Sequence, residues 1–398
     1  MQLKINPISF KANKMSTTQA EHINKKLSEA KNVDIICHNT TDRDCANSAL
    51  AMWDYLNSKG IEARVIISQR NPELLNLRTT NFNMVQANDN KELSKIKPDL
   101  ALCVDFGAEE RVNPNVLKHI KEAPVVLGFD HHCEVDLSRG DFVQFERSLS
   151  DDEVTPTKAN FYSDLTAKSA TCVIYRFLEA SGEEIDNLTA YDLFLGMADD
   201  TLKRNLIKCD GKKGTITAKK ALIEDKNAIE IFNALKEKLT DKQIASIAKA
   251  IDVLSSLSPE QEAFKDSLNN RLQYSKNGKI AYVEIAPDDE EWKKLGGDNI
   301  VTSRIMNNFR QQVLAQNNDV EIAIIFYESQ GTYRLSAHTK EPNLLKFFQY
   351  IEDNAIEDFT NNSGGHPTRG GGGLNSTDKN KCSTWARNII TCDKYFEK

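Results

Sequence analysis

The sequence has no apolar run long enough to cross a lipid bilayer. A membrane-spanning helix needs about 18 consecutive apolar residues, and no segment of the 398 residues approaches that length. The first residues are charged and lack the apolar stretch of a secretory signal. We therefore expect a soluble, unsecreted protein.

Paired cysteines are also missing. The chain has eight cysteines but no C-x-x-C pair, which argues against a zinc ribbon or a thioredoxin-like redox site. Several cysteines lie within apolar runs or beside the polar residues discussed below, where cysteine is typical of a small buried hydrophobe. We expect a reduced, cytoplasmic location.

The chain lacks an excess of positive charge. Its formal net charge is -7, which argues against a broad electrostatic grip on long duplex nucleic acid. This charge is compatible with a short anionic substrate that is held by metal ions. Any binding of phosphate must then be local.

What the sequence does contain is an alternation of apolar runs and helical patterns. Runs that are typical of buried strands alternate with helical segments, among them a short helix near 72–77, and this order predicts an α/β fold with a doubly wound, mostly parallel sheet. A segment rich in Lys, Glu, Ala and Leu suits a helical connector, and a second, smaller α/β domain with a mixed sheet follows it. The expected boundaries are 16–210 for the first domain, 211–275 for the connector and 276–398 for the second domain.

Three of the predicted strands end in side chains that bind metals. Carboxyl ends of adjacent parallel strands meet at one edge of a sheet, so these side chains should form one cluster. Such a crowd of carboxylates and imidazoles would shift its own pKa values strongly unless a divalent cation were bound. The residues are His38 with Asp42 and Asp44 after the first strand, Asp105 after the next, and the triplet Asp130, His131 and His132 after the last.

Two metal ions held about 3.5 to 4 Å apart need a bridging carboxylate. Asp105, isolated at its strand end, is the natural bridge. Asp199 and Asp200 end an apolar helix, where carboxylates oppose the helix dipole unless a cation compensates. The expected ligands are His38 and Asp42 for one ion, and Asp44, His131 and Asp200 for the other.

Structural explanations exist for each motif taken alone. Asp42 and Asp44 could form an acidic turn with Asp44 as a helix N-cap, and Asp105 could be an ordinary loop residue. A triplet such as Asp130 to His132 after a core strand has little structural purpose, which favours a functional explanation.

Near the C-terminus, glycine gathers around one histidine and one arginine. This pattern suggests backbone N–H groups close to an anion, although glycine clusters also mark flexible loops. The candidate substrate-binding residues are Gly364, Gly365, His366 and Arg369, followed by glycines 370–373.

Taken in order, these motifs resemble those of the DHH phosphoesterase family, and most of all its two-domain nanoRNase/pAp phosphatase group. The resemblance implies two manganese ions, with magnesium or cobalt as alternatives, and it implies that Asp105 ligates both. It also implies that His132 lies near the scissile phosphate, that Asp130 orients a neighbouring histidine, and that the Gly-Gly-His motif of a DHH-associated C-terminal domain binds the substrate.

The resulting hypothesis is a manganese-dependent phosphodiesterase that hydrolyses short oligoribonucleotides or linear dinucleotides by two-metal-activated hydroxide attack. 3'-Phosphoadenosine 5'-phosphate is a further candidate substrate, and His132 would steady or protonate the leaving group. The alternatives are a phosphodiesterase for linear or cyclic di-AMP, an inorganic pyrophosphatase and a non-catalytic nucleotide-binding relative. Neither long duplex nucleic acid nor a membrane is an expected partner, and a homodimer remains open.

Overall fold

A computed structural model provides the structure of this chain. It describes residues 15–39, 41–68, 83–107, 111–132, 159–164, 166–255, 257–295, 299–329, 331–340, 344–354 and 369–396. These residues form two compact units, which divide between Asp252 and Val253. The domain boundaries expected at 210 and 275 remain predictions.

The N-terminal unit is built on a six-stranded sheet in which every pair of neighbouring strands is parallel. Its central strands are almost entirely buried and rich in Val, Ile and Leu, as expected for strands covered on both faces. The order across the sheet is β3 (Met84–Gln86), β2 (Glu62–Ile67), β1 (Asn32–Cys37), β4 (Leu100–Val104), β5 (Val125–Asp130) and β6 (Ala159–Ser163).

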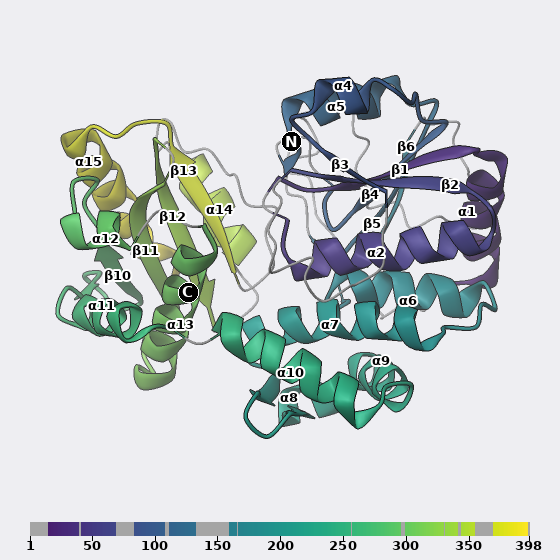
Figure 1. The fold of residues 1–398 in the computed structure, drawn as a ribbon. Helices are drawn as coiled ribbons and strands as arrows, with labels where there is room; N and C mark the ends of the chain where they lie inside the picture. Colours follow the sequence, from purple (N-terminus) through teal and green to yellow (C-terminus); the bar gives the residue numbers. More distant parts are fainter. Residues whose placement is uncertain are drawn as a thin grey trace, which may run out of the picture. The chain divides into compact units, whose positions relative to one another are not determined.

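Helices cover both faces of this sheet, with α1, α2, α6 and α7 on one side and α4 and α5 on the other (Figure 1). Alternate residues of β1 belong to different cores: Ile35 packs with the first group of helices and Ile36 with the second. The bounds are α1 (Thr17–Glu29), α2 (Arg43–Ser58), α4 (Asn90–Leu93), α5 (Pro114–Glu122), α6 (Ala170–Ala180) and α7 (Asn187–Lys203).

The strand order reverses direction next to β1. The chain moves outward from β1 to β2 and β3, and then returns to place β4 on the other side of β1. A reversal of this kind opens a crevice beyond the carboxyl ends of the two central strands, which is where open α/β sheets bind ligands. His38 and Asp105 follow these two strands directly.

A hairpin and a run of helices follow α7. Residues 211–275 were expected to form a helical connector. In the structure β8 pairs with β7 in a hairpin, and the helices of this segment begin only after β8. The boundary between the two units falls within α10. The elements are β7 (Ile207–Asp210), β8 (Thr215–Ala218), α8 (Lys220–Glu224), α9 (Lys226–Glu237), α10 (Asp241–Ser255) and α11 (Pro259–Asn269).

The C-terminal unit contains a mixed sheet of five strands in the order β13, β12, β11, β10, β9. Its strands are β9 (Gln273–Tyr274), β10 (Ile280–Glu284), β11 (Ile322–Ser329), β12 (Thr332–Thr339) and β13 (Arg369–Leu374). Helices α14 (Leu344–Asp353) and α15 (Lys379–Ile390) pack on one face, while α11, α12 (Glu290–Lys294) and α13 (Asn299–Gln316) pack on the other. A short 3-10 helix, Thr391–Phe396, ends the described chain.

The predicted fold class is confirmed: a doubly wound parallel sheet and a second α/β unit with a mixed sheet. Strands β11 and β12 form an antiparallel hairpin, with Gly331 at φ +76° in the turn. The short helix expected near 72–77 lies outside the described residues. Among the helices that the structure describes, none is long and apolar enough to span a bilayer.

Glycines 370–373 form most of strand β13 and pair with β12, so this part of the glycine-rich segment is neither a turn nor a tail. A Cβ atom on Gly371 would lie 2.7 Å from the backbone oxygen of Leu335. At least at this position, glycine is required by the close approach of two strands.

Candidate metal centre

The carboxyl ends of three neighbouring strands bring two imidazoles to one carboxylate. His38 follows β1, Asp105 follows β4 and His131 follows β5. Nε2 of His38 lies 3.3 Å from Oδ2 of Asp105, and Nε2 of His131 lies 3.2 Å from Oδ1 of the same side chain. Asp105 therefore stands between the two histidines, where a bridging ligand is needed.

Asp105 has an unusual backbone conformation. Its φ is +65°, in the left-handed region that costs a residue other than glycine about 1 to 2 kcal/mol and that Asp tolerates better than most. Its backbone N–H donates to the backbone oxygen of Phe129, 2.9 Å away. Strain of this kind at a cluster of polar side chains is typical of functional sites.

Asp42 and Asp44 come from the beginning of α2. The N-cap is Asp42 and not Asp44, because Oδ1 of Asp42 accepts the backbone N–H of Cys45 at 3.2 Å. The same oxygen lies 4.0 Å from Nε2 of His38. The N-cap explanation therefore does not apply to Asp44, and the cap role of Asp42 leaves its carboxylate beside the histidine.

The carboxylate of Asp44 accepts hydrogen bonds from the N-terminus of α6. Its Oδ2 accepts the backbone N–H of Ala170 at 2.6 Å, and its Oδ1 accepts the backbone N–H and the hydroxyl of Thr171 at 3.1 and 2.8 Å. The positive end of a helix dipole stabilises a carboxylate at this position. Oδ2 also lies 3.6 Å from Nε2 of His131.

Asp200 enters the cluster from the last turns of α7, with Oδ2 3.6 Å from Nε2 of His131. The helix can pass this close to α2 because residue 196 is glycine. A Cβ atom there would lie 2.6 Å from Cγ2 of Thr171 and 3.1 Å from Oδ1 of Asp44. The spacing Gly196-x-x-x-Asp200 thus combines a packing requirement with a carboxylate one helical turn later.

Asp130 organises the triplet at the end of β5. Its Oδ1 accepts the backbone N–H groups of His131 and His132 at 2.8 and 3.2 Å, and it lies 2.8 Å from Nδ1 of His132. Burial, with the nearby Arg111 cation, lowers the pKa of His132 to about 4. His132 is therefore neutral near pH 7.

Two cationic side chains contact the cluster, and the sequence analysis did not predict them. Nζ of Lys203 lies 2.7 Å from Oδ2 of Asp42, 2.6 Å from Oδ2 of Asp199 and 3.1 Å from Oδ1 of Asp200. A guanidinium nitrogen of Arg204 lies 3.0 Å from Nδ1 of His131. The sequence spacing could have identified both cations, because residues three and four positions after Asp200 lie on the same helix face as Asp200.

The pKa values show how much negative charge the cluster holds. Burial, with the neighbouring Asp105, Asp200 and Asp42, raises the pKa of Asp44 well above its usual value. Burial also acts to raise the pKa of Asp105, but the imidazoles of His131 and His38 beside its carboxylate hold the pKa well below its usual value. Without further cations, these carboxylates cannot all be ionised easily.

The donor set fits divalent metal ions. Imidazole and carboxylate ligands suit manganese, magnesium, cobalt and zinc, and Oδ1 of Asp105 is buried with no hydrogen bond of good geometry among the described residues. Four groups of candidate ligand atoms each lie within 4.8 Å of one another: His38, Cys45 and Asp105; Asp105, His131 and His132; Asp44, His131 and Asp200; and Asp42, Asp199 and Asp200. The structure thus brings all six predicted ligands together, and their role as ligands stays a prediction.

The predicted substrate-binding residues are described only in part. Gly364, Gly365 and His366 lie outside the described residues. Arg369 is the first residue of β13, where its backbone pairs with His338 of β12.

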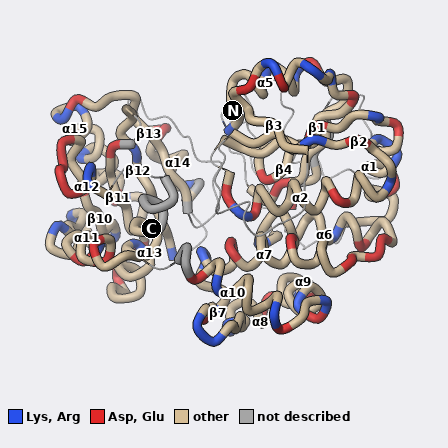
Figure 2. Tube along the Cα trace, in the orientation of Figure 1, with Lys and Arg blue, Asp and Glu red and all other residues tan. Residues whose placement is uncertain are grey.

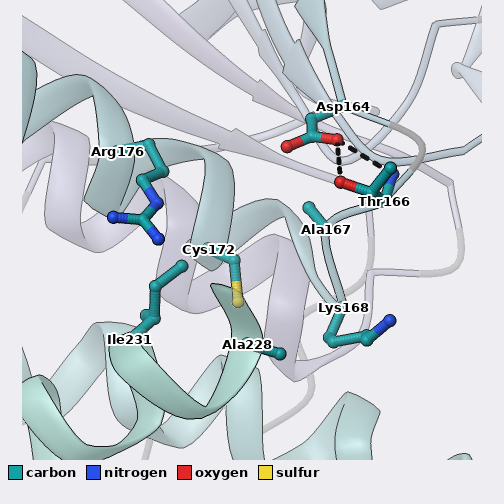
Figure 3. A pocket seen from close by; sticks show the side chains of 8 residues that line it. All are labelled: Asp164, Thr166, Ala167, Lys168, Cys172, Arg176, Ala228 and Ile231. Carbon is teal, nitrogen blue, oxygen red and sulfur yellow. Dashed lines mark hydrogen bonds between the residues drawn. The ribbon is translucent and has the colours of Figure 1, made fainter. Parts of the chain in front are cut away.

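A small hollow lies elsewhere in the N-terminal unit, between the loop before α6, helix α6 itself and α9 (Figure 3). Asp164 accepts the backbone N–H and the hydroxyl of Thr166 at its rim, and Lys168, Cys172 and Arg176 also line it. None of the predicted metal ligands lines this hollow, so it is separate from the carboxylate cluster.

The chain is similar to known proteins in sequence and in fold. Residues 32–197 match the DHH family, N-terminal domain. No curated protein matches the chain significantly. Among solved structures, an exopolyphosphatase-related protein from Bacteroides fragilis superposes with a TM-score of 0.66 at 16% identity, over 95% of this chain and 97% of that one. RecJ from Thermus thermophilus, solved with Mn2+, has a TM-score of 0.49 at 14% identity, over 97% of this chain and 56% of that one.

Proposed function

The N-terminal unit of this chain belongs to the DHH family, whose members are phosphoester hydrolases, and we propose that this protein is a manganese-dependent phosphodiesterase. It cuts short oligoribonucleotides and linear dinucleotides to mononucleotides, and it also removes phosphate from 3'-phosphoadenosine 5'-phosphate. One observation carries the proposal: the predicted ligands form one cluster, buried except at Asp42, in which Asp105 lies 3.3 Å from His38 and 3.2 Å from His131.

The proposed ligands divide into two sets that share Asp105. His38 and Asp42 lie on one side of it, and Asp44, His131 and Asp200 on the other. When bound, two divalent ions would supply an activated water and neutralise the charge that develops on the phosphate. The helix N-terminus at Asp44 holds its carboxylate in one orientation.

His132 is the proposed catalytic side chain beside the phosphate, and Asp130 positions it. The contact of Asp130 with Nδ1 fixes the tautomer in which Nε2 carries the lone pair. Because its pKa is lowered to about 4, the imidazole is neutral at working pH. In this form Nε2 can accept a hydrogen bond from water or from a substrate hydroxyl, but it has no proton with which to stabilise or protonate the leaving oxygen.

The substrate side is assigned to the C-terminal unit. Gly364, Gly365, His366 and Arg369 are proposed to hold the distal phosphate of the substrate, with Arg369 donating hydrogen bonds to phosphate oxygens. Acidic and basic residues alternate along both units, without a continuous basic stretch on the described trace (Figure 2). Such a surface suits a short substrate, because a long nucleic acid needs many phosphate contacts.

Hydrolysis of a substrate panel tests this proposal. The full-length protein is incubated with Mn2+ and with pApA, longer RNA, 3'-phosphoadenosine 5'-phosphate, pyrophosphate or cyclic di-AMP. We expect turnover of pApA and of 3'-phosphoadenosine 5'-phosphate, and much slower turnover of longer RNA. Turnover of pyrophosphate alone or of cyclic di-AMP alone would contradict the substrate assignment, and Mn2+ binding without any turnover would favour a non-catalytic relative.

The bridging role of Asp105 has its own test. Asp105→Asn preserves the size of the side chain, and asparagine tolerates a left-handed backbone conformation. The substitution removes the negative charge. We expect loss of Mn2+ binding and of activity with the fold retained. Asp99→Asn is the matched control, since Asp99 lies at the opposite end of β4 and bonds only to the start of β1 in the described contacts. Full activity of the Asp105 variant would remove this residue from the bridging role.

Arg369→Ala tests the phosphate clamp. Loss of a guanidinium that binds substrate phosphate in the ground state and in the transition state should raise KM with little change in kcat. An unchanged KM for every panel member would exclude the clamp.

A further inference from the structure

A buried thiol lies among the ligand atoms on the His38 side of the cluster. The side-chain ligand atoms of His38, Cys45 and Asp105 all lie within 4.8 Å of one another. The three residues are 2%, 0% and 2% exposed. Two ligands of one metal ion are at most about 4.4 Å apart when each bond is about 2.0 to 2.3 Å long, so small side-chain adjustments would allow all three to bind one ion.

The local fold holds Cys45 at this position. It is the third residue of α2, and its backbone N–H is tied to the N-cap Asp42 at 3.2 Å. Its Sγ donates to the backbone oxygen of Val104 at 3.4 Å. Val104 immediately precedes Asp105, so the thiol lies against the same strand end that presents the central carboxylate.

Three other buried cysteines of the N-terminal unit lie outside the groups of candidate ligand atoms, although the thiol of Cys37 contacts that of Cys45. Among the residues that the structure describes, Cys37, Cys103 and Cys172 are buried but belong to no group of candidate ligand atoms. Sγ of Cys172, for example, lies 3.1 Å from the hydroxyl of Ser169. The explanation of cysteine as a small buried hydrophobe therefore suits these three and does not account for the position of Cys45.

We propose that Cys45 is a ligand of the metal ion on the His38 side, and that it gives this half of the centre a preference for thiophilic divalent ions such as zinc and cadmium over manganese. Thiolate selects softer cations, whereas carboxylate and imidazole alone discriminate less. When the sulfur–metal bond forms, the S–H bond breaks and its proton passes to solvent. The inference rests on the metal centre of the proposed function and adds to it a determinant of metal choice.

Cadmium titration of the full-length, metal-stripped protein tests the inference directly. A cadmium–thiolate bond produces a charge-transfer absorption in the ultraviolet that carboxylate and imidazole ligands lack. We expect this absorption to grow with added Cd2+ in the wild type and in Cys103→Ala, and to be lost in Cys45→Ala. Cys103 is the matched control because it is equally buried, in the neighbouring strand β4.

Competition with Mn2+ supplies the second readout. The ratio of Cd2+ to Mn2+ affinity should fall by about tenfold or more in Cys45→Ala, as expected for loss of a metal-site partner, and should stay constant in Cys103→Ala. Cys45→Ser keeps nearly the same volume and serves if the alanine variant does not fold. A wild-type protein without the absorption, or an equal absorption in the Cys45 variants, overturns the inference.

Failure of the inference is distinguishable from failure of the proposed function. Hydrolysis of pApA with Mn2+ but no cadmium–thiolate absorption removes Cys45 from the ligand set and leaves the phosphodiesterase in place. An absorption that depends on Cys45, without turnover of any panel substrate, retains the ligand and rejects the proposed activity.

Discussion

Replacing Gly196 with alanine would place a methyl group where α7 crosses α2 and the first turn of α6. The added Cβ atom would lie 2.6 Å from Cγ2 of Thr171, 3.1 Å from Oδ1 of Asp44 and 3.2 Å from Cα of Asp44. None of these neighbours is the end of a long, flexible side chain. The helices must therefore separate, and we expect Gly196→Ala to destabilise the N-terminal unit.

The magnitude follows from two opposing terms. Overpacking of a well-packed core costs about 1 to 3 kcal/mol, and three close contacts place this site near the upper end. Alanine in a helix interior is more favourable than glycine by about 1 kcal/mol. The net loss in the free energy of unfolding is therefore about 2 kcal/mol, which corresponds to a Tm lower by about 4 to 8 °C for a unit of this size.

A double-mutant cycle with Thr171→Ser isolates the steric cause. Serine lacks the Cγ2 methyl that makes the shortest contact but keeps the hydroxyl that donates to Asp44. In the serine background we expect Gly196→Ala to cost no more than about 1 kcal/mol, which is a coupling energy of about 1 to 2 kcal/mol. Differential scanning calorimetry of the four proteins measures it. Equal effects of the alanine in both backgrounds, or a Gly196→Ala variant as stable as the wild type, would refute the reasoning.

Three further predictions address charge. Arg64→Met should lower the free energy of unfolding by about 3 kcal/mol, because it removes the two-point partner of the buried Asp34 carboxylate. The loss lies at the low end for a broken buried pair because His119 Nε2 still lies 2.5 Å from Oδ2 of Asp34. Addition of Asp34→Asn should restore part of that loss in guanidinium unfolding curves, and no restoration would contradict the pairing. Backbone N–H groups at the start of β1 lower the pKa of Asp99. This carboxylate therefore stabilises the fold above its unfolded-state pKa, and the contribution disappears as the pH falls through the folded-state pKa. Asp99→Asn should flatten the acid limb of the curve of stability against pH, and an unchanged limb would exclude the effect. Lys203→Ala should tighten Mn2+ binding by up to about fivefold in a calorimetric titration. The reason is that the lysine ammonium competes with the metal for the same carboxylates. Weaker binding would show that the lysine supports the site instead.

The position of the candidate site was predictable because most of its residues follow the carboxyl ends of strands. Each ligand-bearing motif follows an apolar run, and parallel strands place the ends of such runs at one edge. His38, Asp105 and His131 meet for this reason. Asp200 was predictable only as a carboxylate that opposes its helix dipole, and Gly196 explains structurally how that helix reaches the cluster.

Other features depend on contacts that no local pattern records. Strand β6 is short and has no strong apolar signature, so only its pairing with β5 identifies it. Glycines 370–373 favour a loop by composition, yet the partner strand β12 makes them a strand. Cys45 resembles any buried cysteine in sequence, and its proximity to His38 appears only when α2 packs against β4.

The torsion of Asp105 restricts which amino acids its position can accept. Glutamate would also supply a carboxylate, but its longer side chain gains nothing from the local backbone hydrogen bonding that lets Asp and Asn enter left-handed conformations. Asparagine and glycine suit that backbone and bring no anion. Aspartate is thus the one residue type that satisfies both the main chain and the two imidazoles, and random replacement at codon 105 should return only this residue among active clones.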